Sequence, residues 1–416
     1  MRAKLTAGQG VPVVVVSMVV LGIGSSLGFL PGYFVAAVRD DLGISRAQVG
    51  LLVSLHFGCT GLGSIICARI TERIGTRAAV VADQVIVAGA AWGAAILDSY
   101  AALLVASVLA GFAYALANAA TNEVVAAAVP ETRRTLALSA KTSGIPLAAL
   151  IGAVLVPWAS DRWGWNIVLM VAGTAAVAGA LIASAVIPDR RSVRLRPQAG
   201  EPVPARSGGG RFWSPASRLR SRAGEPVLPR GFWWFAVSAF FLVGSSQPLY
   251  SWAVPYLDEG LGGSKPVAGA IAGAASGVGA ICMSLSALRA DRIGRRRRVP
   301  LIVGLCLVLT GAILVVMSGL RLGLAVASAG LFAGLIVQLA AIGTMHAAVV
   351  DRAPHAVARA TGVTMTGYYL GALATPVSFG ALVDWLSTYT WAWLFMALGS
   401  VAAAACFFRA NQVGDL

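Results

Sequence analysis

The sequence predicts an all-α membrane protein built from two related halves of six transmembrane helices each. The chain of 416 residues is 58% hydrophobic and 12% charged, with a mean hydropathy of +0.79. Because a soluble domain carries about 25% charged residues, most of this chain is predicted to lie in lipid. The spacing of its apolar runs and a basic turn that occurs twice point to the same fold class.

Twelve apolar runs are each long enough to cross about 30 Å of hydrocarbon. Backbone groups in lipid must be satisfied within the segment, so each run is predicted to be a helix. The first run is longer than the ~7–15 apolar residues of a signal peptide, which favours a transmembrane helix. The spans are predicted at 11–38, 47–68, 78–97, 100–128, 135–158 and 165–187, and then at 231–257, 266–288, 299–318, 322–350, 360–383 and 389–408.

The basic residues follow the positive-inside rule when the N-terminus is placed in the cytoplasm. In that orientation, 26 of the 32 Lys and Arg residues fall in inside segments and five in outside segments. This bias supports an even number of spans with both termini cytoplasmic. We therefore expect a multi-pass protein of the cell inner (plasma) membrane, and the net charge of +15 is not taken as a sign of nucleic-acid binding.

The segment 188–230 differs from the rest because it is rich in Arg, Pro, Gly and Ser. It has too little apolar sequence to fold alone, so we expect a disordered basic cytoplasmic linker between two bundles, 1–187 and 231–416. Its ten Arg residues could also contact anionic lipid headgroups. The five cysteines lie within or at the ends of apolar runs without metal-ligand spacing, so neither a disulfide framework nor a metal site is expected.

A basic turn at 287–298 has a weaker copy at 68–77, and the acids Glu72 and Asp291 are 219 positions apart. In both copies the acid is followed by Arg, Ile and Gly. The pattern resembles the loop Gly-x-x-x-Asp-Arg-x-Gly-Arg-Arg of the major facilitator superfamily, found between spans 2 and 3 and again between spans 8 and 9. Ala stands for the first Gly in both copies, and the first copy also has Glu72 for Asp and Thr76 for one Arg.

The resemblance covers nearly the whole chain and implies a secondary transporter that works by alternating access, as its two bundles rock. It also implies that the two turns latch the cytoplasmic side, more strongly at the second copy, which keeps the family pattern better. The alternative is that the Arg residues only hold their loops inside. The gating residues implied are Glu72, Arg73, Gly75, Asp291, Arg292 and Gly294.

Ionisable residues inside a span are costly and point to function. At 1.5 Å per residue, Glu123 in the fourth span and Lys141 in the fifth both lie about 10 Å from the cytoplasmic surface. We expect a buried pair, either a structural one, with Lys141 reaching the interface as a variant of that reading, or one that substrate or a proton breaks, which would couple the cycle. His56 and His346 are further coupling candidates because either could titrate near neutral pH, although a lone His in a membrane is more often a hydrogen-bonded packing residue.

Two other positions bear on coupling. Asp83 lies about a turn inside the third span and is expected to pair locally, near Arg77. Ser107 stands where a family pattern linked with proton coupling has Arg, which leaves Glu123 or a His as the expected proton carrier.

Polar residues at matching places in the two halves predict a substrate cavity between them. Asn118 and Asn122 are four residues apart and share a helix face, and Asn122 aligns with His346 in the second half. Close helix packing would explain the Ser and Asn residues about as well. The other candidates for substrate binding are Ser25, Ser26, Tyr33, Ser246, Gln247, Tyr250, Gln338 and Tyr368.

Together these features predict a monomeric secondary transporter without a cofactor, whose partners are a small-molecule substrate, the lipid bilayer and protons. Proton-coupled export of a small organic compound is favoured, and proton-coupled uptake of a small organic anion, attracted by Lys141, is the alternative. A non-transporting receptor would need a folded extramembrane module, which the sequence does not predict. An enzyme would need a nucleophile–base set or metal ligands with workable spacing, and the sequence shows neither. The sequence has no ATP-binding P-loop motif, so transport driven directly by ATP is not expected.

Overall fold

The computed structural model describes residues 10–130, 133–188, 228–229, 231–290, 294–354 and 356–413. Within these ranges the chain forms helices and no strand. The first half contains α1 Gly10–Ser25, η2 Ser26–Gly28, α2 Leu30–Tyr33, α3 Val35–Leu42, α4 Arg46–Ile74, α5 Thr76–Leu97, α6 Tyr100–Ala128, α7 Arg134–Thr142, α8 Gly144–Trp163 and α9 Trp165–Val186. The second half contains α11 Trp233–Ser246, α12 Pro248–Ser251, α13 Ala253–Pro255, η4 Tyr256–Gly260, α14 Lys265–Ala290, α15 Arg295–Leu322, α16 Leu324–Arg352, α17 Val357–Leu386 and α18 Tyr389–Val413.

Each predicted span coincides with a helix or with a broken helix, so the all-α membrane fold is confirmed. Among the described residues, ten helices are long and apolar enough to cross a membrane, and α4 is an eleventh if its 61° bend is accepted within one span. The remaining predicted span, 231–257, is broken, since α11 has 14 residues and short helical pieces follow it.

Local sequence explains where the spans begin and turn. Ser45 and Gln48 form a capping box at the start of α4, in which the backbone N–H of Gln48 donates to Ser45 Oγ at 3.2 Å. Gly75 joins α4 to α5 with a φ of 92°, a conformation that favours glycine. This turn is tied to the end of α9, because Arg77 Nε donates to the Ile187 carbonyl at 2.6 Å.

The helix breaks occur at matching places in the two halves. α1 stops at Ser25 and α2 has Pro31 as its second residue, while α11 stops at Ser246 and Pro248 begins α12. Proline lacks the backbone N–H that would continue a helix and is tolerated in a first turn, where both prolines lie. Gly32, in the first break, packs against the backbone of the second half.

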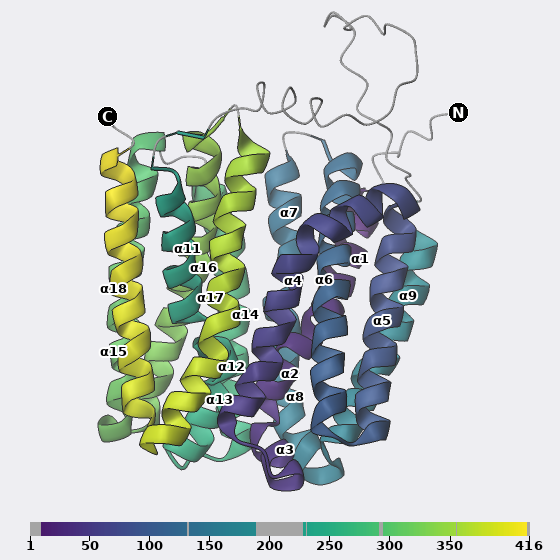
Figure 1. Cartoon of the computed structure of the whole chain (residues 1–416), viewed down its shortest axis with the longest axis vertical. Helices are drawn as coiled ribbons and strands as arrows, with labels where there is room; N and C mark the ends of the chain where they lie inside the picture. The colour runs from purple at the N-terminus through teal and green to yellow at the C-terminus, as the bar shows by residue number, and fades with distance from the viewer. Residues whose placement is uncertain are drawn as a thin grey trace, which may run out of the picture.

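The two halves lie side by side, with α1 to α9 in one group and α11 to α18 in the other (Figure 1). They meet along two helix pairs, α4 with α17 and α8 with α14, and at their breaks, where α2 contacts α12 and α13. We call this contact the seam. Glycines allow these helices to approach closely: Gly50 packs on the backbone of Pro376, and Gly269 packs on that of Ala153. α1 begins and α18 ends at the same end of the molecule.

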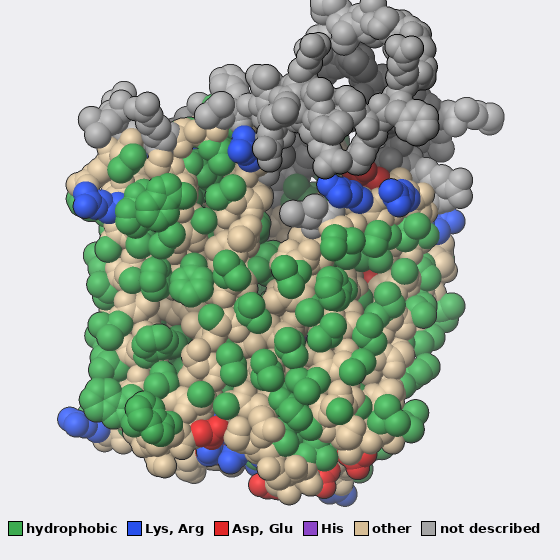
Figure 2. Space-filling view, viewed as in Figure 1, with side chains coloured by type: hydrophobic (Ala, Val, Ile, Leu, Met, Phe, Trp, Pro, Cys, Tyr) green, Lys and Arg blue, Asp and Glu red, His purple; other side chains and the backbone are tan. Residues whose placement is uncertain are grey.

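The surface agrees with a lipid environment. Figure 2 shows hydrophobic side chains over the middle of the visible face and charged side chains gathered at its two ends. We call the end that carries Glu259 the outer end and the opposite one the inner end, after their predicted sidedness.

Candidate functional site

A row of rings crosses the middle of the seam from one half to the other. Tyr114 on α6 lies beside His56, with ring centroids 5.8 Å apart, and His56 contacts Phe57 at 5.2 Å. Phe57 contacts Phe29, in the break after η2, at 5.7 Å. Phe29 then meets Tyr250 of the second half at 5.9 Å. An aromatic surface therefore connects the two halves at their breaks.

Several buried polar atoms have no partner, and two of the residues that carry them, His56 and Tyr250, belong to this row of rings. In the described part of the chain, no hydrogen-bond partner is found for either ring nitrogen of His56, for Gln247 Nε2, for the Tyr250 hydroxyl or for Gln338 Oε1. Leaving such groups unpaired is costly, and buried polar groups are normally hydrogen-bonded. A bound molecule that offers donors and acceptors would satisfy them. We call His56, Gln247, Tyr250 and Gln338 the central cluster.

Two other predicted Tyr residues lie close to the central cluster. Tyr33 and Tyr368 both come near enough to Tyr250 to interact with its hydroxyl electrostatically. Tyr368 also contacts Tyr369, with ring centroids 5.2 Å apart. The prediction that both halves contribute aromatic groups to one site remains a prediction, and this arrangement supports it.

The serine candidates are differently placed. The hydroxyls of Ser25 and Ser246 donate to carbonyls of their own helices, Gly22 at 2.9 Å and Leu242 at 2.8 Å. Their hydrogen bonds are thus made inside the helix, which favours the packing alternative. Ser26 lines a separate apolar cavity of about 640 Å³ between α1, α8 and α9. Its hydroxyl is buried and has no partner among the described residues, so its place in a substrate site stays a prediction.

The expected pair of Glu123 and Lys141 is also not formed. The Lys141 ammonium donates instead to Asn122 Oδ1 at 2.7 Å, Asn118 Oδ1 at 3.0 Å and Thr121 Oγ1 at 3.3 Å. These three acceptors lie one turn apart on a single face of α6, whereas Glu123 is a further 100° or so around the helix. Glu123 is half-buried on its own side.

Lys141 consequently has only neutral partners. Its side chain is 0% exposed, and no carboxylate lies within ion-pair distance of it among the described residues. Asn122, its nearest partner, is exposed, so one side of this group reaches the molecular surface. A buried cation without a counter-charge favours an anion. Asn118, one of the partners of Lys141, lies one helical turn from Tyr114 on α6, which is at one end of the row of rings.

The histidines differ in their surroundings. His56 is fully buried and packed between Tyr114 and Phe57, whereas His346 on α16 has an exposed side chain. Whether His346 and Asn122 line one cavity stays a prediction, as do the coupling roles of both histidines.

The latch residues lie at the inner end. Glu72 and Arg73 are exposed in the last turn of α4, beside Gly75, and Gly294 precedes α15. Asp291 and Arg292 lie outside the described residues. The latch therefore stays a prediction.

The outer end contains a charge network that the sequence reasoning missed. Arg46 binds Glu259 through two guanidinium nitrogens, and Arg46 Nη1 contacts Asp384 at 3.4 Å. Arg39 reaches Glu259 at 3.5 Å, and the Tyr389 hydroxyl donates to Glu259 at 3.3 Å. The only available signal was that Arg39 and Arg46 are two of the five basic residues predicted outside.

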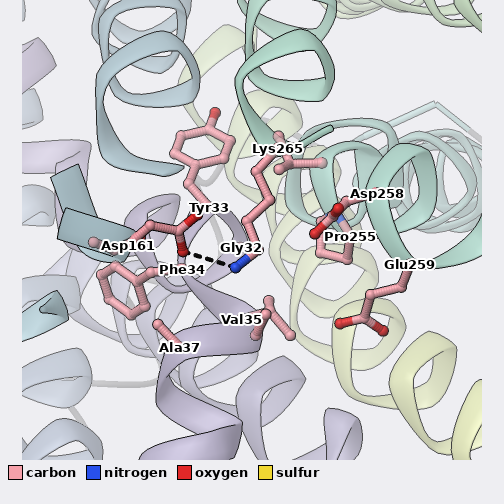
Figure 3. A pocket seen from close by; sticks show the side chains of 13 residues that line it. Gly32, Tyr33, Phe34, Val35, Ala37, Asp161, Pro255, Asp258, Glu259 and Lys265 are labelled. Carbon is pink, nitrogen blue, oxygen red and sulfur yellow. Dashed lines mark hydrogen bonds and ion pairs between the residues drawn. The ribbon is translucent and has the colours of Figure 1, made fainter. Parts of the chain in front are cut away.

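A second ion pair closes the other side of the outer end. Figure 3 shows Lys265 of α14 pointing to Asp161 of α8, and their Nζ and Oδ1 atoms are 2.7 Å apart. Asp258 lies beside this pair, and burial raises the pKa of its carboxyl while Lys265 opposes the rise. Charges from both halves thus hold the seam shut at this end.

Asp83 also departs from its expected place. Arg77 donates to a backbone carbonyl and not to Asp83, which is fully buried beside Gln84. The side chain faces inward, toward α1, because Asp83 lies on the buried face of α5.

Known proteins resemble this chain in sequence and in fold. Residues 14–376 match the model of the Major Facilitator Superfamily. The gentisate transporter of Corynebacterium glutamicum is 26% identical over 163 residues, which is 38% of this chain and 36% of that protein. The 4-hydroxybenzoate transporter PcaK of Acinetobacter baylyi is 20% identical over 158 residues, 38% of this chain and 35% of that protein. The alignments thus span only about a third of each relative.

A solved structure extends the likeness over the whole fold. A bacterial homologue of the human lysosomal transporter Spinster, in an inward-facing and occupied conformation, has a TM-score of 0.72 at 15% identity, with 96% of each chain covered. The family match covers most of the chain, and the helices and their breaks agree with it. The chain belongs to the Major Facilitator Superfamily: it is a membrane transporter and not an enzyme.

Proposed function

We propose that this transporter carries small aromatic carboxylic acids into the cell together with protons. The observation that carries the proposal is the buried Lys141 ammonium, whose three partners are neutral oxygens; one of them, Asn118, lies one helical turn from Tyr114 in the row of aromatic rings. Two relatives, a gentisate transporter and a 4-hydroxybenzoate transporter, support this substrate class by their names.

Each part of such a molecule finds a matching group. Its carboxylate could replace one of the amide oxygens on Lys141 and form a stronger, charge-assisted hydrogen bond. Its ring could pack on Phe29 or Tyr250 in the seam. A ring hydroxyl could pair with the unpartnered atoms of Gln247 or Gln338.

Proton coupling follows from the charge of the substrate. Moving one negative charge into a cell against an inside-negative potential costs about 2.3 kcal/mol per 100 mV. A proton carried in the same direction cancels that charge. Uptake of an aromatic anion therefore needs at least one proton to be electrically neutral.

The test uses the purified protein in liposomes of known orientation, with an imposed pH gradient and radiolabelled gentisate or 4-hydroxybenzoate. Accumulation driven by inward proton flow is expected, whereas an aromatic amine of similar size should not accumulate. Accumulation only under outward exchange would support export, the direction that the sequence favoured. No gradient-driven movement of either acid would overturn the proposal.

Lys141→Met provides the site-specific arm. We expect binding of the acid to weaken on the order of tenfold to a hundredfold, since a charge-assisted hydrogen bond contributes about 1.5–3 kcal/mol. Arg321→Met removes an exposed basic residue at the outer end and is the matched control. Thermal unfolding of both variants checks that they fold, and Lys141→Arg should restore part of the binding. Equal affinity of Lys141→Met and the control would exclude Lys141 from the site.

A further inference from the structure

A carboxyl group is buried in the first half without a charged partner. Asp83 on α5 is 0% exposed. Its Oδ2 accepts one hydrogen bond from Gln84 Nε2 at 2.6 Å, and no partner is found for Oδ1 among the described residues. Gln84 Nε2 also donates to the Val20 carbonyl of α1 at 3.0 Å, so this polar pair lies between α5 and α1.

The helices around Asp83 provide no cation at this level. The sequences of α1 and α9 contain no titratable side chain. α6 contributes Tyr114, which lies within electrostatic reach of the carboxyl, and α4 contributes His56 behind the ring of Tyr114. On α5 itself, Arg77 is exposed and donates to the Ile187 carbonyl. The charged residues at the inner end of α4 are also exposed: Arg69, Glu72 and Arg73.

The protonated acid is the favourable form in this arrangement. An ionised carboxylate away from water costs several kcal/mol unless a cation and further hydrogen bonds compensate it. Asp83 has one hydrogen bond and no cation, so the neutral acid fits the packed state. Ionisation would require water or a donor to reach Oδ1, which means that the helices around it must separate.

The helix that would have to move is α1. A Cβ atom placed on Gly24 would lie 2.9 Å from Asp83 Oδ2, so α1 touches the carboxyl at this residue. Gly24 directly precedes the break at Ser25, and Phe29 in that break contacts Tyr250 of the second half. A movement of α1 at Asp83 would therefore shift Phe29, which contacts the second half in the seam.

We propose that Asp83 is a proton-binding site and that its protonation controls how closely α1 packs on α5. The proton moves between water and the Asp83 carboxylate, and no other bond changes. In the proposed function, this site supplies the proton that accompanies the substrate. Its role in coupling therefore rests on that function.

The first test needs no substrate. Infrared difference spectra of the wild-type protein and Asp83→Asn in lipid, at neutral pH, should show one carboxylic-acid band that shifts in heavy water and is lost in the variant. Glu123→Gln, which changes the other carboxyl near this level, should keep the band. If the carboxylic-acid region is the same in wild type and Asp83→Asn, Asp83 is ionised and the proposal fails. Thermal unfolding confirms that the nearly isosteric Asn variant is folded.

The second test separates this inference from the proposed function. In the liposome assay, Asp83→Asn should lose gradient-driven accumulation, down to the level seen without a gradient, while substrate exchange across the membrane continues. If the wild type accumulates the acid and Asp83→Asn does so equally, Asp83 is not the coupling site. If the wild type shows no response to the gradient, the proposed function fails, and the infrared result alone decides the protonation of Asp83.

Discussion

The outer end and the middle of the seam satisfy their polar groups in opposite ways. At the outer end, Arg46 and Glu259 pair across the two halves, and further charges complete the network. In the middle, the buried polar atoms of Gln247, Tyr250 and Gln338 have no partner among the described residues. Paired charges hold two surfaces together, whereas unpaired buried groups favour a ligand that supplies their hydrogen bonds. The outer end therefore closes the seam, and the middle is the surface proposed for binding.

Glu259→Gln is expected to have the largest effect, because it weakens the charge network that closes the outer end. The change leaves Arg46 without its main partner, in a group whose side chains are 23% and 18% exposed. With a cost of about 1–2 kcal/mol, the population with an open outer end should rise about fivefold to thirtyfold. Distances between spin labels at Asp40 and Ser264, in a cysteine-free background, report the opening. Arg321→Gln serves as an exposed control at the same end, and an unchanged distance distribution would show that the network does not hold the seam.

An intermediate effect is expected from Tyr250→Phe, which removes a buried hydroxyl without a partner. The variant should be more stable to unfolding by about 1 kcal/mol and should bind the aromatic acid about fivefold to tenfold more weakly. Calorimetry and a binding titration measure the two effects. Ser246→Ala removes a hydroxyl that is bonded to its own helix, so its affinity should stay at the wild-type level. Loss of stability in Tyr250→Phe would mean that the hydroxyl has a structural partner.

The smallest effect is expected from Asp161→Asn. The pair that Asp161 forms with Lys265 is more exposed, at 44% and 32%, than the pair of Arg46 and Glu259. Exposed pairs contribute about 0–1 kcal/mol, so the same spin labels should show at most about a fivefold change. An effect as large as that of Glu259→Gln would mean that burial does not decide how much each ion pair contributes to closing the outer end.

Contacts between residues close in the sequence could be predicted from their spacing, whereas contacts between distant residues could not. Asn118 and Asn122 share a helix face by their spacing, and the structure shows both bound to Lys141. Arg46 and Glu259 are 213 residues apart, and no local pattern relates them. Ser26 lines a cavity between α1, α8 and α9, and this cavity depends on how the three helices pack, which the hydrophobic pattern does not reveal.

The sequence alone determined which segments cross the membrane and that the chain has two similar halves. These features depend on local hydrophobicity and backbone chemistry, which neighbouring residues carry. The tertiary structure alone decided the partners of Lys141, the burial of Asp83 against Gly24 and the charge network of the outer end. Each of these depends on the rotation of one helix against another, and that rotation is set by packing between residues far apart in the chain.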